Sequence, residues 1–259
     1  MDDLNQTVMV PKEIALLPPM PAFVFPLAKY YVTTFKTDKE ALTEILPEKV
    51  VPMPGFEDQV LFQVNNFTTY WEAVVSIPAI YKSNGNETPG IYLSQLYLGS
   101  IVPEGSALPM VLGQIGAGYP KRDAIFTVSD FGEANSEIKL ERFGKTIVDM
   151  KHKMGAIITD YSNLPFGTDL TDMTAFLLKA IPAADNKGWS VLQLTSPQAP
   201  QGGEGKIKRV NRVETTFNSD VVLDSGRVLP VKEQLSSLYF EIEDMGLSHA
   251  DILNDYLTD

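Results

Sequence analysis

TTYWEAVVSIPAI (residues 68–80) and IYLSQLYL (residues 91–98) are the stretches that decide the fold. Both are rich in β-branched and aromatic residues, which favour strands. The segment that joins them is too short for the crossover helix that parallel neighbours require. We therefore expect two consecutive antiparallel strands at the centre of the chain.

Further strand-like segments lie on both sides of this pair. They cover residues 30–36, 60–64, 124–128, 137–143, 146–153, 189–195, 206–217 and 237–243. Glycine and asparagine separate most of them, as is typical of short turns. Many strands joined in this way predict a mainly β (α+β) class, with antiparallel sheets around a closed β-barrel and a few short helices.

The expected helices are few. Thr37 begins a capping box with Glu40, followed by a short apolar stripe that Pro47 ends. A loop with a short helix is expected near residues 110–115, and residues 248–257 have the pattern of a closing amphipathic helix. Residues 18–26 are rich in proline and predict an extended arm packed on the body.

Composition limits the class of protein. The 259 residues favour a single domain over residues 1–259, and the chain has no cysteine. A net charge of −12 argues against nucleic acid and anionic membranes as partners. The N-terminal stretch lacks a basic region before an uninterrupted apolar one, so no signal peptide is expected. A cytoplasmic location is the resulting prediction.

Two motifs are set aside on spacing. Gly202 to Lys206 is glycine-rich, but a phosphate-binding loop needs four residues between its glycines and Ser or Thr after the lysine. The chain's two histidines, His152 and His249, are far apart in sequence and predict no zinc site. We interpret both histidines as surface or packing residues.

Lys121 ends a small, uncharged stretch that begins at Gly113, and Arg122 follows it directly. An ammonium cannot attack a carbonyl, whereas a neutral amine can. Desolvation and a neighbouring cation both disfavour the ammonium, a means of activating lysine known from acetoacetate decarboxylase. The spacing alone is also compatible with a plain surface Lys-Arg pair.

Several segments, in order along nearly the whole chain, resemble the acetoacetate decarboxylase family. They are residues 31–47, Tyr70-Trp71-Glu72 with Ile77-Pro78, Tyr119-Pro120-Lys121, residues 178–182, residues 229–233 with Ser236-Ser237, and Asp255-Tyr256-Leu257. Each segment is only moderately specific, but their order over this length is strongly so. Arg122 stands where the family has a second lysine.

The resemblance implies Lys121 as the imine-forming nucleophile, Arg122 as the cation that favours the free amine, and Glu72 as the active-site carboxylate. It also implies a small keto-acid substrate, homo-oligomers, and no metal or organic cofactor. Strand alternation puts Tyr70, Glu72 and Val74 on one face.

The chain departs from the family pattern at three places. Gln63 stands at the family's second active-site glutamate. The carboxylate-binding arginine falls on Ala28, with Lys29 one place along, and Gly113-Gln114-Ile115 replaces Gly-Arg-Glu. Gln63, Lys29 and Gln114 are therefore the candidate substrate-binding residues.

Three functions remain open at this point. The first is a lyase that decarboxylates a β-keto acid such as acetoacetate through a Lys121 Schiff base. The second is a Schiff-base aldolase or dehydratase acting on pyruvate or another 2-keto acid. The third is a non-catalytic barrel that binds a small acid or an apolar ligand.

Overall fold

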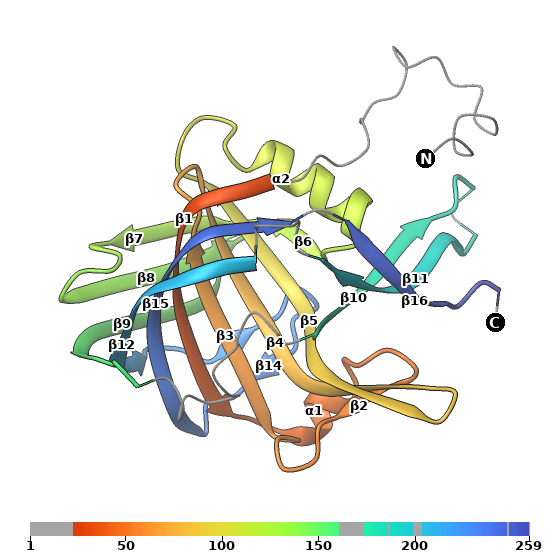
Figure 1. Ribbon diagram of the computed structural model, residues 1–259, viewed down its shortest axis with the longest axis horizontal. Coiled ribbons are helices and arrows are strands. Elements are labelled where there is room, and N and C mark those ends of the chain that lie inside the picture. The colour runs from red at the N-terminus through yellow and green to blue at the C-terminus, as the bar shows by residue number, and fades with distance from the viewer. Residues whose placement is uncertain (1–22, 161–173, 186, 199–203, 248, 259) are drawn as a thin grey trace.

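The computed structural model describes residues 23–160, 174–185, 187–198, 204–247 and 249–258 (Figure 1). Within these residues the chain is mainly β, and its strands form one large mixed sheet and a small two-stranded one. The strands of the large sheet are β1 (Phe23–Lys36), β2 (Val50–Pro52), β3 (Gln59–Asn66), β4 (Tyr70–Ser83), β5 (Asn86–Ser100), β6 (Lys121–Asp123), β7 (Ile125–Ser129), β8 (Asn135–Arg142), β9 (Lys145–Ile157), β10 (Thr174–Pro182), β11 (Trp189–Pro197), β12 (Glu204–Phe217), β15 (Glu233–Leu247) and β16 (Ala250–Asp255).

The remaining elements are short. The small sheet pairs β13 (Val221–Val222) with β14 (Val228–Leu229). The helices are α1 (Lys39–Thr43), α2 (Ala107–Leu112) and a π-helical turn, η1 (Gly113–Ala117). The predicted short helix near residues 110–115 is confirmed. No helix in the described ranges is long and apolar enough to cross a membrane.

The prediction of a closed barrel is wrong. The strand order runs β16-β11-β10-β5-β4-β3-β1-β15-β12-β9-β8-β7, and its two ends do not pair with each other. The far edge of β5 pairs instead with β10 and β6, both in parallel. Figure 1 shows β10, β11 and β16 as a separate wing beside the curved central strands. Hairpin signals describe neighbouring strands only, so they could not reveal that β5 ends the antiparallel run.

Two helix predictions also need correction. Residues 250–255 form β16 rather than a helix, because they pair with the free edge of β11. Tertiary pairing here overrides a weak local helical pattern. The helix after Thr37 exists, but its N-cap is Asp38 and makes no side-chain capping bond. The arm predicted over residues 18–26 lies mostly outside the described residues; Phe25 packs on Phe67 with ring centroids 4.5 Å apart.

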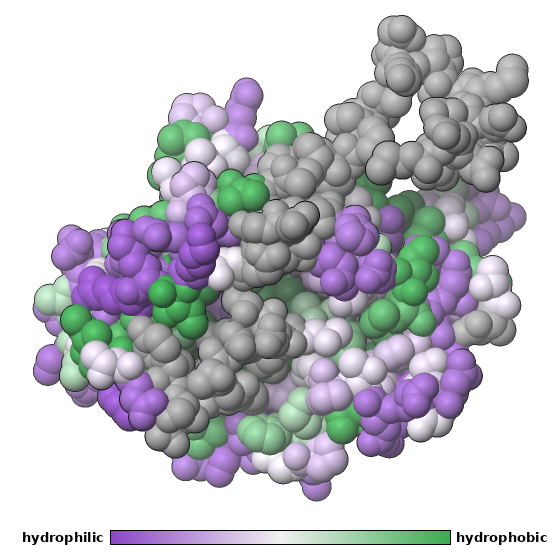
Figure 2. Space-filling model, in the orientation of Figure 1, coloured by the Kyte–Doolittle hydropathy of each residue, from purple (hydrophilic) through white to green (hydrophobic). Residues whose placement is uncertain are grey.

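Both faces of the central strands are buried, and they serve two separate cores. Tyr31 and Phe35 of β1 belong to one core cluster, whereas Tyr30 and Val32 belong to the other. Successive side chains of a strand point to opposite faces, so one strand supplies both clusters. The second cluster surrounds the candidate site. Figure 2 shows a hollow near the centre of the face seen in Figure 1.

Candidate active site

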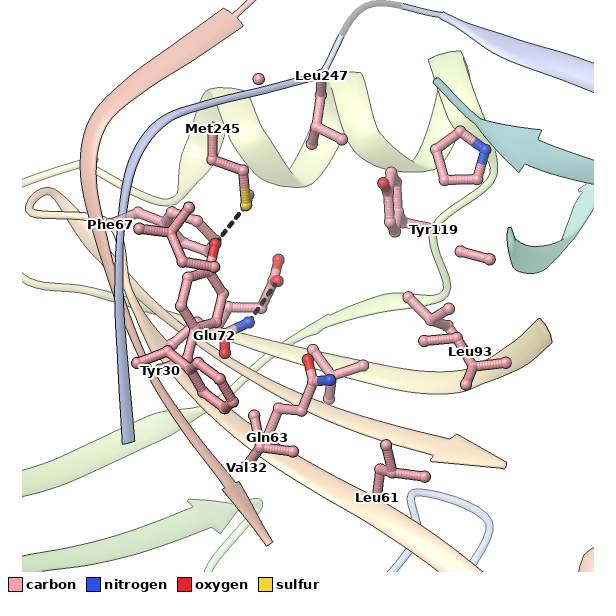
Figure 3. Close-up of a pocket in the computed structure, with 18 of the residues that line it drawn as sticks. Tyr30, Val32, Leu61, Gln63, Phe67, Glu72, Leu93, Tyr119, Met245 and Leu247 are labelled. Atoms are coloured by element: carbon pink, nitrogen blue, oxygen red, sulfur yellow. Dashed lines mark hydrogen bonds between the residues drawn. The ribbon is translucent and has the colours of Figure 1, made fainter. Parts of the chain in front are cut away.

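A cavity of about 270 Å³ opens within the second core cluster (Figure 3). Aromatic and aliphatic side chains make most of its wall. Its polar side chains include Gln63, Asn65, Glu72 and Lys121. Apolar cavities with a few convergent polar groups are the usual form of a small-molecule site.

Strand register places Glu72 and Asn65 directly opposite each other. Glu72 of β4 pairs with Asn65 of β3, which in turn pairs with Tyr30 of β1. All three side chains line the cavity. The amide of Asn65 donates from Nδ2 to Oε1 of Glu72 at 3.3 Å, and both residues are buried. The bond holds Oε1 of the carboxylate, while Oε2 faces the Lys121 amine.

Lys121 reaches the same cavity from the neighbouring row of the sheet. It pairs in parallel with Leu96 of β5, and Leu96 pairs with Val74 of β4. Val74 lies two residues from Glu72, on the same strand face. The register therefore brings Glu72 and Lys121 together, although 48 residues lie between them in the sequence.

The Lys121 amine is buried and has two acceptors. Its Nζ donates to the carbonyl oxygen of Pro109 at 3.1 Å and lies 3.5 Å from Oε2 of Glu72. The ring centroid of Tyr119 is 5.0 Å away. A neutral amine has two N–H groups and one lone pair. The two acceptors can therefore hold its hydrogens while the lone pair stays available for attack.

The α2–η1 segment contacts both the side chain and the backbone of Lys121. Gly113 has no side chain, and a Cβ there would lie 2.7 to 2.8 Å from the Cε, Cδ and Nζ atoms of Lys121. Gln114 donates from Nε2 to the Lys121 carbonyl at 2.7 Å. Gly118 ends η1 with φ of 90°, a conformation that suits glycine. This segment fixes both the backbone and the side chain of the lysine.

Three tyrosines share the cavity with the carboxylate. Burial is the main cause that raises the pKa of Tyr30, Tyr70 and Tyr119 above the ordinary value, and the negative charge of Glu72 raises it further. Their hydroxyls therefore stay neutral at physiological pH. The Tyr30 hydroxyl donates to the sulfur of Met245. Neutral phenols near an anion can act as hydrogen-bond donors to a bound ligand.

Arg122 lies outside the cavity lining. It follows Lys121 in β6, so its side chain lies on the other face, where 44% of it is exposed. Its Nε is 3.5 Å from Oδ2 of Asp224, and its NH1 donates to the Lys121 carbonyl at 2.8 Å. The guanidinium is thus next to the lysine backbone and not next to its amine.

The predicted substrate-binding residues are divided. Gln63 lines the cavity, whereas Lys29 and Gln114 do not. Lys29 lies between Ala28 and Tyr30 in β1, and both of these neighbours belong to the core cluster of the site. Successive side chains of a strand point to opposite faces, so Lys29 points away from that cluster. Because β1 pairs with strands on both sides here, a one-residue shift of Lys29 would break two ladders. Ala28 belongs to the core cluster around the site but does not line the cavity, and its methyl group carries no charge.

Sequence reasoning missed Asn65, the role of Tyr119, and the Pro109 carbonyl. Asn65 could have been found, because it lies two residues after Gln63 in a strand and therefore shares its face. Tyr119 was quoted in the lysine motif without a role. A backbone carbonyl that contacts Lys121 from another element leaves no signal in the sequence.

The described residues contain no cluster of three or more His, Asp or Glu side chains that could hold a metal ion. His152 is buried and stacks on Tyr31 with ring centroids 4.1 Å apart. His249 is exposed beside Asp251. One histidine thus packs in the core and the other lies on the surface, which are the two roles predicted for them.

Comparisons with known proteins point to one family. The family model described as "Acetoacetate decarboxylase (ADC)" matches residues 9–257. Acetoacetate decarboxylase of Clostridium botulinum is 26% identical over 245 residues, covering 88% of this chain and 87% of the relative. That of Clostridium acetobutylicum is 25% identical, covering 99% and 98%.

Solved structures show the same fold. A chain described under "Structural Studies of Acetoacetate Decarboxylase" has a TM-score of 0.74 at 20% identity, with 99% of this chain and 98% of that chain covered. The enduracididine biosynthesis enzyme MppR complexed with pyruvate has a TM-score of 0.67 at 16% identity, covering 94% of each chain.

Proposed function

The chain belongs to the acetoacetate decarboxylase family, and we infer that it is a lyase that decarboxylates a β-keto acid through an imine at Lys121. Its membership supports an enzyme with acetoacetate decarboxylase-like function. Decarboxylation through an imine at Lys121 is supported by one observation above all. The buried Lys121 amine lies in the cavity wall between the Pro109 carbonyl and the Glu72 carboxylate.

The proposed reaction begins with the neutral amine. Nζ attacks the keto carbon, and loss of water gives a protonated imine. The bond between the α-carbon and the carboxylate then breaks, and its electron pair moves toward the imine to form an enamine. Carbon dioxide leaves, the α-carbon takes a proton, and water hydrolyses the imine to release a ketone and the amine.

Glu72 is the proposed proton carrier for these steps. Its Oε2 is 3.5 Å from Nζ, within easy reach once a substrate adjusts the side chains. Asn65 holds the other oxygen, so the carboxylate keeps a constant orientation toward the lysine. In this proposal Asn65 is a positioning residue, because it acts through Glu72.

The cavity wall favours decarboxylation over aldol or dehydration chemistry. Among the described residues that line it, Lys121 is the only cation. An aldolase or dehydratase keeps its substrate carboxylate through the cycle and benefits from a fixed cation. A decarboxylase gains when the carboxylate is poorly stabilised before it leaves as a neutral gas. The lining thus supports the lyase.

Two measurements test the proposal together. Acetoacetate should release acetone and carbon dioxide into the headspace, and borohydride with acetoacetate should add the reduced ligand's mass to a peptide that contains Lys121. Lys121→Met should abolish both. Gas release that continues in Lys121→Met would overturn the lysine mechanism. An unsaturated acid formed from pyruvate and an aldehyde, with no gas from any β-keto acid, would support the aldolase or dehydratase. Ligand stabilisation without any adduct would indicate a binding protein.

A further inference from the structure

A second cavity of about 290 Å³ meets the first at Lys121. The two cavities share four lining residues, namely Tyr70, Tyr119, Lys121 and Leu247. The rest of the second cavity comes mainly from α2, through Leu108, Pro109 and Leu112, from Gly113 of η1, and from Phe25 near the start of β1. The Lys121 amine therefore lies on the boundary between two chambers.

The two chambers differ in chemistry. The first, here called the polar chamber, contains the side chains of Gln63, Asn65 and Glu72. The second, here called the apolar chamber, has Lys121 as its only charged side chain among the described lining residues. Figure 3 shows Tyr119 and Leu247 on the side of the polar chamber where a helix crosses behind them. A ligand at Nζ would meet amide and carboxylate groups on one side and α2 on the other.

An imine made from a ketone carries two substituents on its carbon. In a β-keto acid, one of them bears the carboxylate and the other is the rest of the chain. A carboxylate without hydrogen-bond donors is costly to bury, whereas an amide such as that of Gln63 can donate to it. The carboxylate-bearing substituent therefore fits the polar chamber, where Gln63 can donate to it while the like charge of Glu72 keeps it poorly stabilised, as decarboxylation requires. The remaining substituent faces the apolar chamber.

We propose that the substrate of this enzyme is a β-keto acid whose second substituent is an apolar alkyl or aryl chain longer than a methyl group. The proposal rests on the lysine mechanism proposed above. The apolar chamber has a volume of about 290 Å³, whereas a cavity that holds one water molecule needs only about 10–15 Å³. A methyl group would leave most of the apolar chamber without a partner, and few polar groups there could hold water in its place.

The test uses methyl ketones of increasing length, because these are the products of such substrates and retain the apolar chain. Acetone, 2-pentanone, 2-heptanone and 2-nonanone form the series. Each ketone is tested as a competitive inhibitor of acetoacetate decarboxylation. Its affinity should rise roughly fourfold per added methylene until the chamber is full. Calorimetry with Lys121→Met, which cannot form an imine, should give a similar dependence on chain length. Equal affinity for every ketone in both proteins would overturn the proposal.

Two variants of α2 locate the effect. Leu108 lines the apolar chamber, whereas Val111 of the same helix lines neither chamber, and both are partly exposed. Leu108→Trp should flatten the dependence on chain length, both in the inhibition series and in calorimetry. Val111→Trp should change neither result. A flattened dependence in Val111→Trp as well would contradict the assignment of this chamber.

The outcomes separate the two proposals. If acetone is trapped on Lys121 but longer ketones bind no better, the lysine mechanism stands and the substrate class is wrong. If no ketone is trapped while affinity rises with length in a manner that Leu108→Trp removes, the apolar chamber stands and the lysine mechanism is wrong.

Discussion

Asn65 and Glu72 lie directly opposite each other on neighbouring antiparallel strands, and the amide of Asn65 donates to Oε1 of the carboxylate at 3.3 Å. The other oxygen, Oε2, faces the Lys121 amine at 3.5 Å. The orientation of the carboxylate is thus set by a residue that does not itself touch the amine.

Asn65→Leu should lower turnover by roughly 5- to 150-fold, since loss of a buried hydrogen bond to a charged group costs about 1–3 kcal/mol. The loss should appear in kcat more than in KM, because Asn65 orients Glu72 rather than the substrate. Steady-state kinetics and thermal unfolding separate this effect from instability. A variant with wild-type kcat would show that the orientation of Glu72 does not depend on this bond.

Glu72→Gln should keep the fold and reduce turnover by about 100-fold or more, the usual scale for a positioned proton carrier. Glu137→Gln is the matched control, because Glu137 is exposed on β8, pairs with Lys151 and does not line the cavity. The assay is acetone release from acetoacetate. Equal rates in the two variants would remove Glu72 from the mechanism.

Gly113→Ala should reduce activity by roughly 10- to 100-fold without loss of stability. The new Cβ would lie 2.7 to 2.8 Å from the end of the Lys121 side chain, which must then move. Displacement of a reacting group by about 1 Å can cost on the order of 100-fold in rate. Alanine is more favourable than glycine in a helix by about 1 kcal/mol, so the free energy of unfolding should be unchanged or higher. Wild-type activity would mean that the amine tolerates displacement.

Arg122 and Asp224 should shift the acid limb of the rate profile in opposite directions. Arg122→Gln removes a cation near β6 and should favour the ammonium form of Lys121, moving the limb to higher pH. Asp224→Asn removes an anion beside Arg122 and Arg142, and should move the limb to lower pH. Each shift should be below about one pH unit, because exposed charges are screened by water and salt. If neither variant shifted the acid limb, the charge of Arg122 would have no effect on the amine. Arg122 would then act on Lys121 only through its hydrogen bond to the Lys121 carbonyl.

His152 should make the protein less stable in acid. Burial lowers the pKa of its imidazole from 6.5 to about 3. Between these values the unfolded chain binds a proton that the folded chain does not, so stability rises with pH across this window and is lost as pH falls below 6.5.

This loss should amount to about 1.4 kcal/mol per pH unit from His152 alone. Denaturant unfolding from pH 3 to pH 7 measures the slope. His152→Gln should flatten it, whereas the exposed His249→Gln should not. The same slope in His152→Gln as in the parent protein would place the acid sensitivity elsewhere.

Much of the fold and one half of the site followed from local patterns. The long strands around Tyr70 and Tyr92 were predicted from their composition, as were the short helix before Lys121 and the shared face of Tyr70, Glu72 and Val74. Lys121 itself was singled out by its uncharged surroundings and by the ordered family motifs. Apart from the family motifs, which extend along nearly the whole chain, these features depend on residues within a few positions of one another, which is the range over which propensity and strand alternation act.

What the sequence by itself determined is therefore most of the long strands, their alternating faces and the candidate lysine; β10 was not predicted, and β16 was predicted as a helix. Only the tertiary structure decided that the sheet stays open, because pairing of β5 with β6 and β10 depends on segments far apart in the chain. The same pairing delivers Lys121 to Glu72, brings the Pro109 carbonyl onto the amine, and turns Arg122 away from it. Long-range register sets all of these contacts, and no local pattern encodes it.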